Sequence, residues 1–324
     1  MEENETLQLE EQVVSPEKFD DENVNPLEIL RRQLKLLRSN FLLILSPGNK
    51  QFKDISKRVR LMFIAFLVPS ALFILKMFVF EESTQIYLWM GISYILSVVV
   101  YFLNIWALKF QVRKESYLSV MNLPPAFVFT SSMFLSLLFL GPLNRVYLII
   151  IFLLAIVLFM LVLYILLLAV NVLNVNLFYV IPLSKLAETL GYFYSIASMF
   201  FLSYSASSII LYGMKTSDLL MLSAGIITVL LVSTVIFFNS VYYYTPIQGG
   251  GALFAVSLAI VTCIVMVVST FFFPYVVLVG IVSCLEVYVL LGILIHKTQN
   301  TLKPQVYLEY FIIFAIILLI ILLV

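Results

Sequence analysis

The sequence predicts an all-α, polytopic helical membrane protein with about nine transmembrane helices, in a range of eight to ten, and a short cytosolic N-terminal tail. Of its 324 residues, 63% are hydrophobic and 11% are charged, and the mean hydropathy is +1.09. Soluble domains average about 45–50% apolar and about 25% charged residues. The charges also concentrate in residues 1–60, which carry 21 of the 37. The remainder divides into apolar runs long enough to cross a bilayer.

The first part of the tail, residues 1–24, is acidic and poor in aromatic residues. This composition is typical of disorder. Residues 25–60 form the second part, an amphipathic basic helix with a juxtamembrane segment. The helix is predicted to begin at Asn25, because a capping residue, Pro26 and an acid in the first turn follow the usual start pattern.

Apolar and basic residues then alternate along this helix. The apolar positions, spaced by three and four, are Leu27, Leu30, Leu34, Leu37, Phe41 and Ile44, and the basic positions between them are Arg31, Arg32, Lys35 and Arg38. A basic amphipathic helix binds anionic lipids at a membrane surface. We therefore expect it to lie on anionic inner-leaflet lipids, with docking on the membrane domain or on other membrane subunits as alternatives.

Residues 61–324 are the predicted transmembrane helical domain. A span needs about 20 apolar residues, and backbone groups in lipid must be bonded within their own segment, which favours helices. The connections are short, which favours antiparallel neighbours. The predicted spans are residues 61–80, 86–108, 119–140, 146–170, 189–212, 218–239, 251–272, 275–296 and 305–324.

One run exceeds the length of a single span. Residues 146–180 would form a helix about 52 Å long at 1.5 Å per residue. We expect this helix to cross by about residue 168 and then to project, kink or turn along the inner interface before Pro182.

The distribution of Lys and Arg predicts the orientation, because cytoplasmic loops carry the excess of basic residues. With the N terminus inside, sixteen basic residues lie on the inner side: the ten of the tail, Lys109, Arg113, Lys114, Lys185, Lys297 and Lys303. The other side holds only Arg145 and Lys215. The sequence thus predicts an integral protein of the plasma (cell inner) membrane, with a cytoplasmic N terminus and, for nine spans, an external C terminus.

Two ionisable residues inside spans are candidates for an ion or proton site, since such groups are costly in lipid. Glu286 lies about eleven residues into its predicted span, near the bilayer midplane, where it could bind and release a proton or coordinate a cation. Lys76 lies about four residues from the outer end of the first span. Snorkelling to the interface is the ordinary explanation for Lys76, and a buried pair with Glu286 is the alternative.

The densest polar cluster of the membrane domain lies at the inner ends of the fourth and fifth spans. It comprises Asn171, Asn174, Lys185 and Glu188. Asn171 and Asn174 are one helical turn apart and share a face. The cluster is predicted to be an inner-face vestibule or a lipid-headgroup contact, with a helix end emerging into water as the alternative.

The sequence predicts no catalytic residues, no metal site and no cofactor. Its one histidine, His296, excludes two-histidine zinc motifs within this chain. Beyond residue 60 it contains a single aspartate, Asp218, and two arginines, whereas membrane phosphatases and transferases need clusters of such charges to hold metals and phosphates. Nucleic acid is not an expected partner, because the basic cluster before the first span is explained by topology. We therefore expect a protein that is not an enzyme.

Two classes of function remain. The first is a non-enzymatic membrane component, an accessory or scaffold subunit of a larger assembly, favoured by scarce buried charge, short loops and a tail suited to docking. The alternative is a small secondary transporter or proton-coupled permease that uses Glu286 as its midplane proton or cation site. An apolar or lipid-like substrate needs few polar groups within the membrane.

Overall fold

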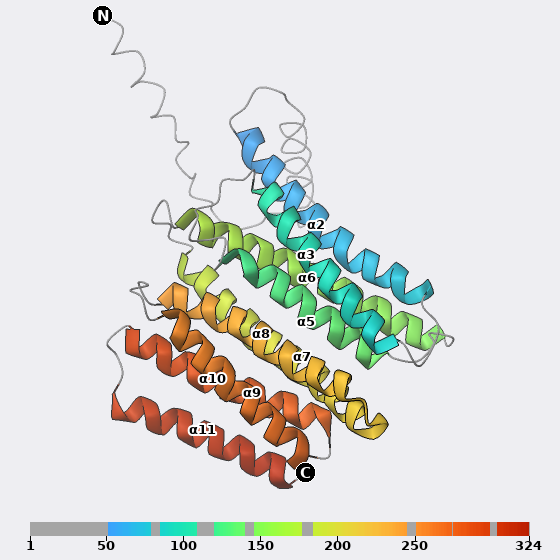
Figure 1. The fold of residues 1–324 in the computed structure, drawn as a ribbon. Helices are drawn as coiled ribbons and strands as arrows, with labels where there is room; N and C mark the ends of the chain where they lie inside the picture. The colour runs from blue at the N-terminus through green and yellow to red at the C-terminus, as the bar shows by residue number, and fades with distance from the viewer. Residues whose placement is uncertain are drawn as a thin grey trace, which may run out of the picture. The chain divides into compact units, whose positions relative to one another are not determined.

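The described chain is helical throughout, apart from a few turn and end residues (Figure 1). The computed structural model describes residues 51–78, 85–108, 120–139, 146–176, 184–244, 251–273, 275–298 and 303–323. The chain divides into two units, Met1–Ile55 and Ser56–Val324, and the second is the helical bundle considered below. The predicted disordered segment and the amphipathic helix with Arg31, Arg32, Lys35 and Arg38 lie outside the described residues.

The elements follow one another in a regular series. They are α2 (Gln51–Phe78), α3 (Gln85–Ala107), the short 3-10 helix η1 (Val120–Asn122), α5 (Leu123–Leu138), α6 (Val146–Asn176), α7 (Ser184–Thr216), α8 (Leu219–Tyr244), α9 (Gly251–Phe272), α10 (Val276–Thr298) and α11 (Pro304–Leu323).

Eight of these helices are long and apolar enough to cross a membrane, as counted over the described residues. The chain is therefore a multi-pass helical integral membrane protein, and the predicted class is confirmed. Each of the nine predicted runs contains a helix. The last run, α11, contributes a shorter apolar stretch over its described side chains, Pro304–Ile316, and is not among the eight. The count thus falls at the lower end of the expected range.

The observed helices are longer than the predicted spans in several places. Helix α2 begins ten residues before the expected start at residue 61. Helix α6 runs without a break for 31 residues, about 46 Å, and so continues past residue 168 to Asn176. Whether the end of the helix projects from the membrane or turns along the interface stays a prediction, whereas its unbroken course to Asn176 is observed. The reason for this unbroken course is local, because the segment contains neither Gly nor Pro to interrupt the helix.

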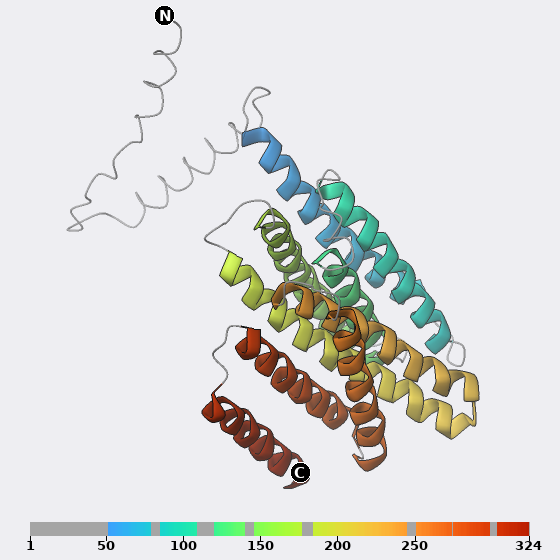
Figure 2. The ribbon, with the colours of Figure 1, turned by 60° about the vertical axis from the view of Figure 1, so that its left-hand side comes forward.

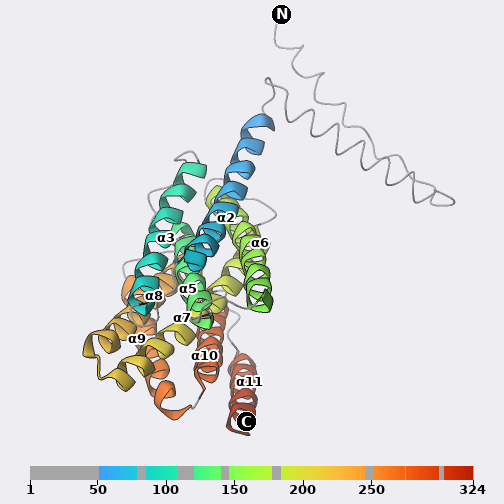
Figure 3. The same cartoon turned by 90° about the vertical axis from the view of Figure 1, so that its right-hand side faces the viewer.

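Helix α5 is the most enclosed of the eight candidate spans. It packs against α3, α6, α7 and α8 (Figure 3). Pro124 and Pro125 occupy its first turn, where the missing backbone N–H groups cost nothing, and Asn122 of η1 precedes them. The prolines therefore begin this helix and leave its interior intact.

Helix α7 connects two hydrophobic clusters of the bundle. One cluster joins residues of α2, α3, α5, α6 and α7, and the other joins residues of α7, α8, α9 and α10 with Ala126 of α5. Close approach depends on small residues: a Cβ at Gly280 of α10 would lie 3.0 Å from the Phe200 ring of α7. Small residues at helix contacts serve this purpose in membrane proteins generally.

Three hydroxyl groups of α7 are bonded within its own backbone. Ser195, Ser205 and Ser208 donate to the carbonyl oxygens four residues earlier, at 2.9, 2.7 and 2.9 Å respectively. Such bonds satisfy a hydroxyl group that water cannot reach. Of the other buried serines of α7, Ser207 bonds to Thr270 of α9, whereas Ser198 and Ser203 have no partner among the described residues.

The edges of the bundle are less enclosed. Helices α2 and α3 run side by side at one edge, and α11 lies beside α10 at another (Figure 2). Within the described elements, α10 is the main packing partner of α11. The candidate site lies beside the space between α10 and α11.

Candidate functional site

Glu286 lies at the middle of α10, as the eleventh of its 23 residues. It is 8% exposed. Thr262 of α9, which is fully buried, donates its hydroxyl hydrogen to Glu286 Oε1 over 3.2 Å. Glu286 Oε2 is buried and has no hydrogen-bond partner among the described residues. The carboxyl group is therefore held on one side only.

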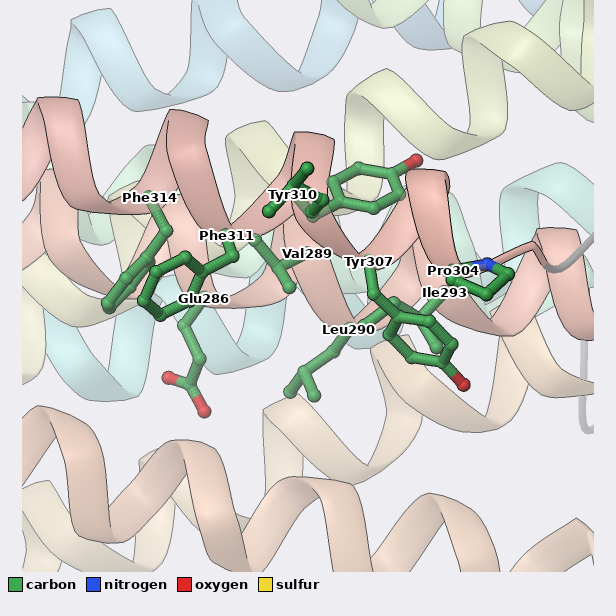
Figure 4. Close-up of a pocket in the computed structure, with 10 residues that line it drawn as sticks. Glu286, Val289, Leu290, Ile293, Pro304, Tyr307, Tyr310, Phe311 and Phe314 are labelled. Atoms are coloured by element: carbon green, nitrogen blue, oxygen red, sulfur yellow. The ribbon is translucent and has the colours of Figure 1, made fainter.

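A groove of about 610 Å³ opens beside this residue, between α10 and α11. Its described lining residues are Glu286, Val289, Leu290, Ile293, Pro304, Tyr307, Leu308, Tyr310, Phe311 and Phe314. Glu286 is the only charged residue among them. The Glu286 side chain borders the groove, with its carboxyl oxygens pointing away from the aromatic rings of α11 (Figure 4). The carboxyl group thus lies towards Thr262 of α9, at the border of the groove.

One wall of the groove depends on a glycine. A Cβ atom added at Gly292 of α10 would collide with the hydroxyl group and ring of Tyr310 from α11. The Tyr310 ring also packs edge-on against Tyr288 of α10, with ring centroids 5.5 Å apart. Gly292 therefore provides the space in which Tyr310 docks α11 on α10.

The arrangement around Glu286 has a clear chemical consequence. A buried carboxylate with a single neutral hydroxyl donor is costly, because its charge is poorly compensated away from water. A proton or a small cation on the second oxygen removes that cost. The carboxyl group and Thr262 can therefore hold a proton or a cation, and the apolar groove beside them suits a hydrophobic molecule.

Lys76 lies elsewhere in the bundle, near the end of α2. Its Nζ is 4.8 Å from the ring centroid of Trp89 on α3, and the residue is only 3% exposed. Among the described residues Nζ has no hydrogen-bond partner. The described residues therefore show no contact between Lys76 and Glu286, and snorkelling of the ammonium group to the membrane interface stays a prediction. The indole ring of Trp89 provides a buried place for it that the sequence did not reveal.

The predicted inner-face cluster is described only in part. Asn174 is buried, whereas Asn171 and Glu188 are half-buried, on the facing helices α6 and α7. The side chain of Lys185 lies outside the described residues. A vestibule formed by these four residues therefore stays a prediction.

Sequence reasoning missed Thr262. A signal was available, because Thr262 is the twelfth of 22 residues in α9 and Glu286 is the eleventh of 23 in α10. Two successive antiparallel spans place these positions at the same depth. A hydroxyl residue at the depth of a buried acid on the neighbouring span is a partner candidate on that ground.

A second missed contact lies at the end of the bundle where α3 begins. The hydroxyl group of Tyr87 donates to Asp218 Oδ2 over 2.6 Å. Asp218 Oδ1 accepts the backbone N–H groups of Leu220 and Met221 at 3.0 and 3.2 Å, and so caps α8. The hydrogen bond from Tyr87 and these backbone bonds lower the pKa of Asp218 below its ordinary value.

Over the described residues, no group of three His, Cys, Asp or Glu side chains is placed to hold a metal ion. Comparison of the chain with protein-family models, with curated proteins and with solved structures gave no match. The functional argument therefore rests on the geometry of this bundle.

Proposed function

We propose that this protein is a small secondary transporter or proton-coupled permease, in which Glu286 is the proton or cation site. The observation that carries the proposal is the half-satisfied carboxyl group of Glu286: Oε1 accepts from Thr262, whereas Oε2 is buried without a described partner. Ionisable residues within membrane spans mark ion and proton pathways by default.

The groove between α10 and α11 suggests the kind of substrate. Its lining is apolar and aromatic apart from Glu286. An apolar or lipid-like molecule fits such a lining, because it needs few polar partners. In the proposed cycle, Glu286 takes up a proton or cation when the groove side opens, and Thr262 keeps the carboxyl group oriented while α11 moves against α10.

A non-enzymatic accessory or scaffold subunit is the second candidate. The hydrogen bond from Thr262 to Glu286 favours it, because a protonated glutamic acid bonded to a neighbouring helix also serves as a packing contact. In either proposal the chain carries no catalytic activity of its own.

The proposal keeps the orientation predicted from the basic residues, in the plasma membrane with the N terminus cytoplasmic. It treats α11 as a ninth crossing, so that the C terminus lies outside. The inner-face cluster of Asn171, Asn174, Lys185 and Glu188 is then the proposed cytoplasmic gate, and the basic tail helix contacts anionic inner-leaflet lipids or other subunits.

Infrared difference spectroscopy of the full chain in lipid vesicles tests the transporter proposal. Glu286→Gln assigns the carboxyl band by its loss. We expect the Glu286 band to change with bulk pH and to shift when the solvent is exchanged for D₂O, because protons reach the site. A band insensitive to both would contradict the transporter and favour the scaffold.

The matched variant is Thr262→Val, which removes the hydroxyl donor and keeps the side-chain shape. It should shift the Glu286 carbonyl band to higher frequency, since the carbonyl loses a hydrogen bond. A band at the wild-type position in Thr262→Val would show that this bond does not orient the carboxyl group.

A further inference from the structure

We propose that Lys76 and Trp89 form a binding site for the phosphate group of an anionic phospholipid. This site is separate from the Glu286 groove and does not depend on transport. It lies between α2 and α3, near the end of the bundle where α2 ends and α3 begins.

The site consists of buried hydrogen-bond donors without an acceptor. A lysine ammonium group has three N–H donors and a tryptophan indole has one, and neither offers an acceptor. Lys76 is 3% exposed and Trp89 is fully buried, and their ring-to-Nζ distance is 4.8 Å. Within the described part of the chain, both Lys76 Nζ and Trp89 Nε1 lack a hydrogen-bond partner. Each group therefore lacks an acceptor among the described residues, and an anion would stabilise the buried ammonium group.

A third polar group follows on the same helix. Ser93 is one turn after Trp89 on α3, is fully buried, and its Oγ has no described partner either. Residues four apart share a helical face. The α3 face that carries Trp89 therefore presents two polar groups without partners.

A second cation–tryptophan contact between α2 and α3 differs from the first in having a hydrogen-bond acceptor for the cation. The Arg60 guanidinium group lies 5.1 Å from the Trp106 ring centroid. Arg60 also donates to the backbone carbonyl oxygen of Trp106 over 3.4 Å. That cation has its own acceptor, whereas Lys76 Nζ has none among the described residues.

The depth of the site points to a lipid headgroup. Lys76 is the third residue from the end of α2, and Trp89 is the fifth residue of α3. Both are therefore within about one helical turn, roughly 5–6 Å, of the helix ends. Phosphate and ester groups of lipids, and the aromatic residues that contact them, occupy the interfacial depth.

The surface around the site suits acyl chains. Ile74, two residues before Lys76 on α2, is 53% exposed, and Leu88, next to Trp89 on α3, is 45% exposed. A phospholipid whose phosphate reaches Lys76 and Trp89 can lay its chains along these apolar side chains. Free inorganic phosphate shares the chemistry of the headgroup but has no acyl chain to contact this apolar surface.

The test measures lipid retained by the full chain. The purified protein in detergent micelles is titrated with phosphatidylglycerol, phosphatidylcholine or inorganic phosphate, and bound lipid is counted by native mass spectrometry. We expect the wild type to bind one more phosphatidylglycerol than Lys76→Gln does, and to prefer it to phosphatidylcholine. Lys76→Gln should weaken that binding at least about tenfold, because a charge-assisted bond is lost.

Two further variants separate this site from other sources of affinity. Trp89→Phe keeps an aromatic ring and removes the N–H donor, and should weaken the same binding event by about threefold to tenfold. Lys215→Gln is the matched control, because it removes one positive charge from an exposed residue of α7. It should bind lipid as the wild type does, and any contribution of the basic tail is common to all variants.

Three results would overturn the proposal. The first is equal phosphatidylglycerol binding in the wild type, Lys76→Gln and Trp89→Phe. The second is an equal loss in Lys215→Gln, which indicates an unspecific charge effect. The third is binding of inorganic phosphate that is lost in Lys76→Gln, without any phosphatidylglycerol binding, which would assign the site to a free anion.

Discussion

Tyr87 and Asp218 lie 131 residues apart in the chain, and the hydroxyl group of Tyr87 donates a 2.6 Å hydrogen bond to the Asp218 carboxylate. The contact joins the first turn of α3 to the cap of α8. Asp218 is one of the few carboxylates beyond the tail, and it lies between two candidate spans. Its ionisation is therefore coupled to how two distant helices meet.

This contact predicts a pH dependence of stability. Because folding lowers the pKa of Asp218, chiefly through the bond from Tyr87, the carboxylate stabilises the fold above its unfolded pKa of about 3.9. That contribution is lost as the pH falls through the lower, folded pKa. We expect the Tm of the wild type to fall relative to Asp218→Asn as the pH is lowered from about 5 to about 2.

Tyr87→Phe is the control for this experiment. It removes the largest cause of the shift and should shrink the pH-dependent difference in Tm, measured by thermal unfolding in detergent. The same difference in wild type and Tyr87→Phe would mean that the backbone bonds of the cap alone lower the pKa of Asp218.

Gly292→Ala should loosen the packing of α11 on α10. The added methyl group meets the Tyr310 hydroxyl and ring, and overpacking of this kind costs about 1–3 kcal/mol. Thermal unfolding gives the measurement, and the loss should be smaller when Gly292→Ala is combined with Tyr310→Ala. Gly91→Ala is the matched control, since a Cβ at Gly91 has no neighbour within 4 Å. A loss of stability in Gly91→Ala equal to that in Gly292→Ala would remove the steric explanation.

Thr262→Val should cost about 0.5–1.5 kcal/mol, because Glu286 loses the donor at Oε1. Thr262→Ser keeps the hydroxyl group and should retain most of the wild-type stability. The free energy of unfolding of the two variants is the quantity to compare. An unchanged free energy of unfolding in Thr262→Val would show that the hydrogen bond to Glu286 adds nothing to stability.

Ser207 and Thr270 connect α7 to α9 through their hydroxyl groups, 3.0 Å apart. Thr270 donates its own hydrogen to the carbonyl oxygen of Met266 at 2.8 Å, so Ser207 is the donor between the helices. Ser207→Ala should destabilise the bundle by about 0.6 kcal/mol, the average for such bonds in membranes.

The adjacent Ser208→Ala is the comparison for this bond. Ser208 donates to the backbone carbonyl oxygen of Tyr204 within its own helix. Its removal should leave stability within about 0.5 kcal/mol of the wild type. A cost in Ser208→Ala as large as that in Ser207→Ala would show that the contact with Thr270 adds nothing.

The sequence by itself determined the class of the protein and which apolar runs of the described chain are helical, but not where each helix begins and ends. Hydrophobic length is a local property, so twenty apolar residues predict a span whatever the span later contacts. The same reasoning placed Glu286 at the middle of its helix. This reasoning underestimated the length of α6. Apolar residues mark the part of a helix that crosses lipid, whereas the helix itself continues until a residue interrupts its backbone.

Only the tertiary structure decided which side chains of different helices contact one another. Thr262 beside Glu286, Trp89 beside Lys76, and Tyr310 over Gly292 each join two different helices. Such pairs depend on the rotation and closeness of neighbouring helices, which many small packing contacts set together. In lipid every helix is apolar around most of its surface, so the pattern of one helix does not reveal the face that its neighbour covers.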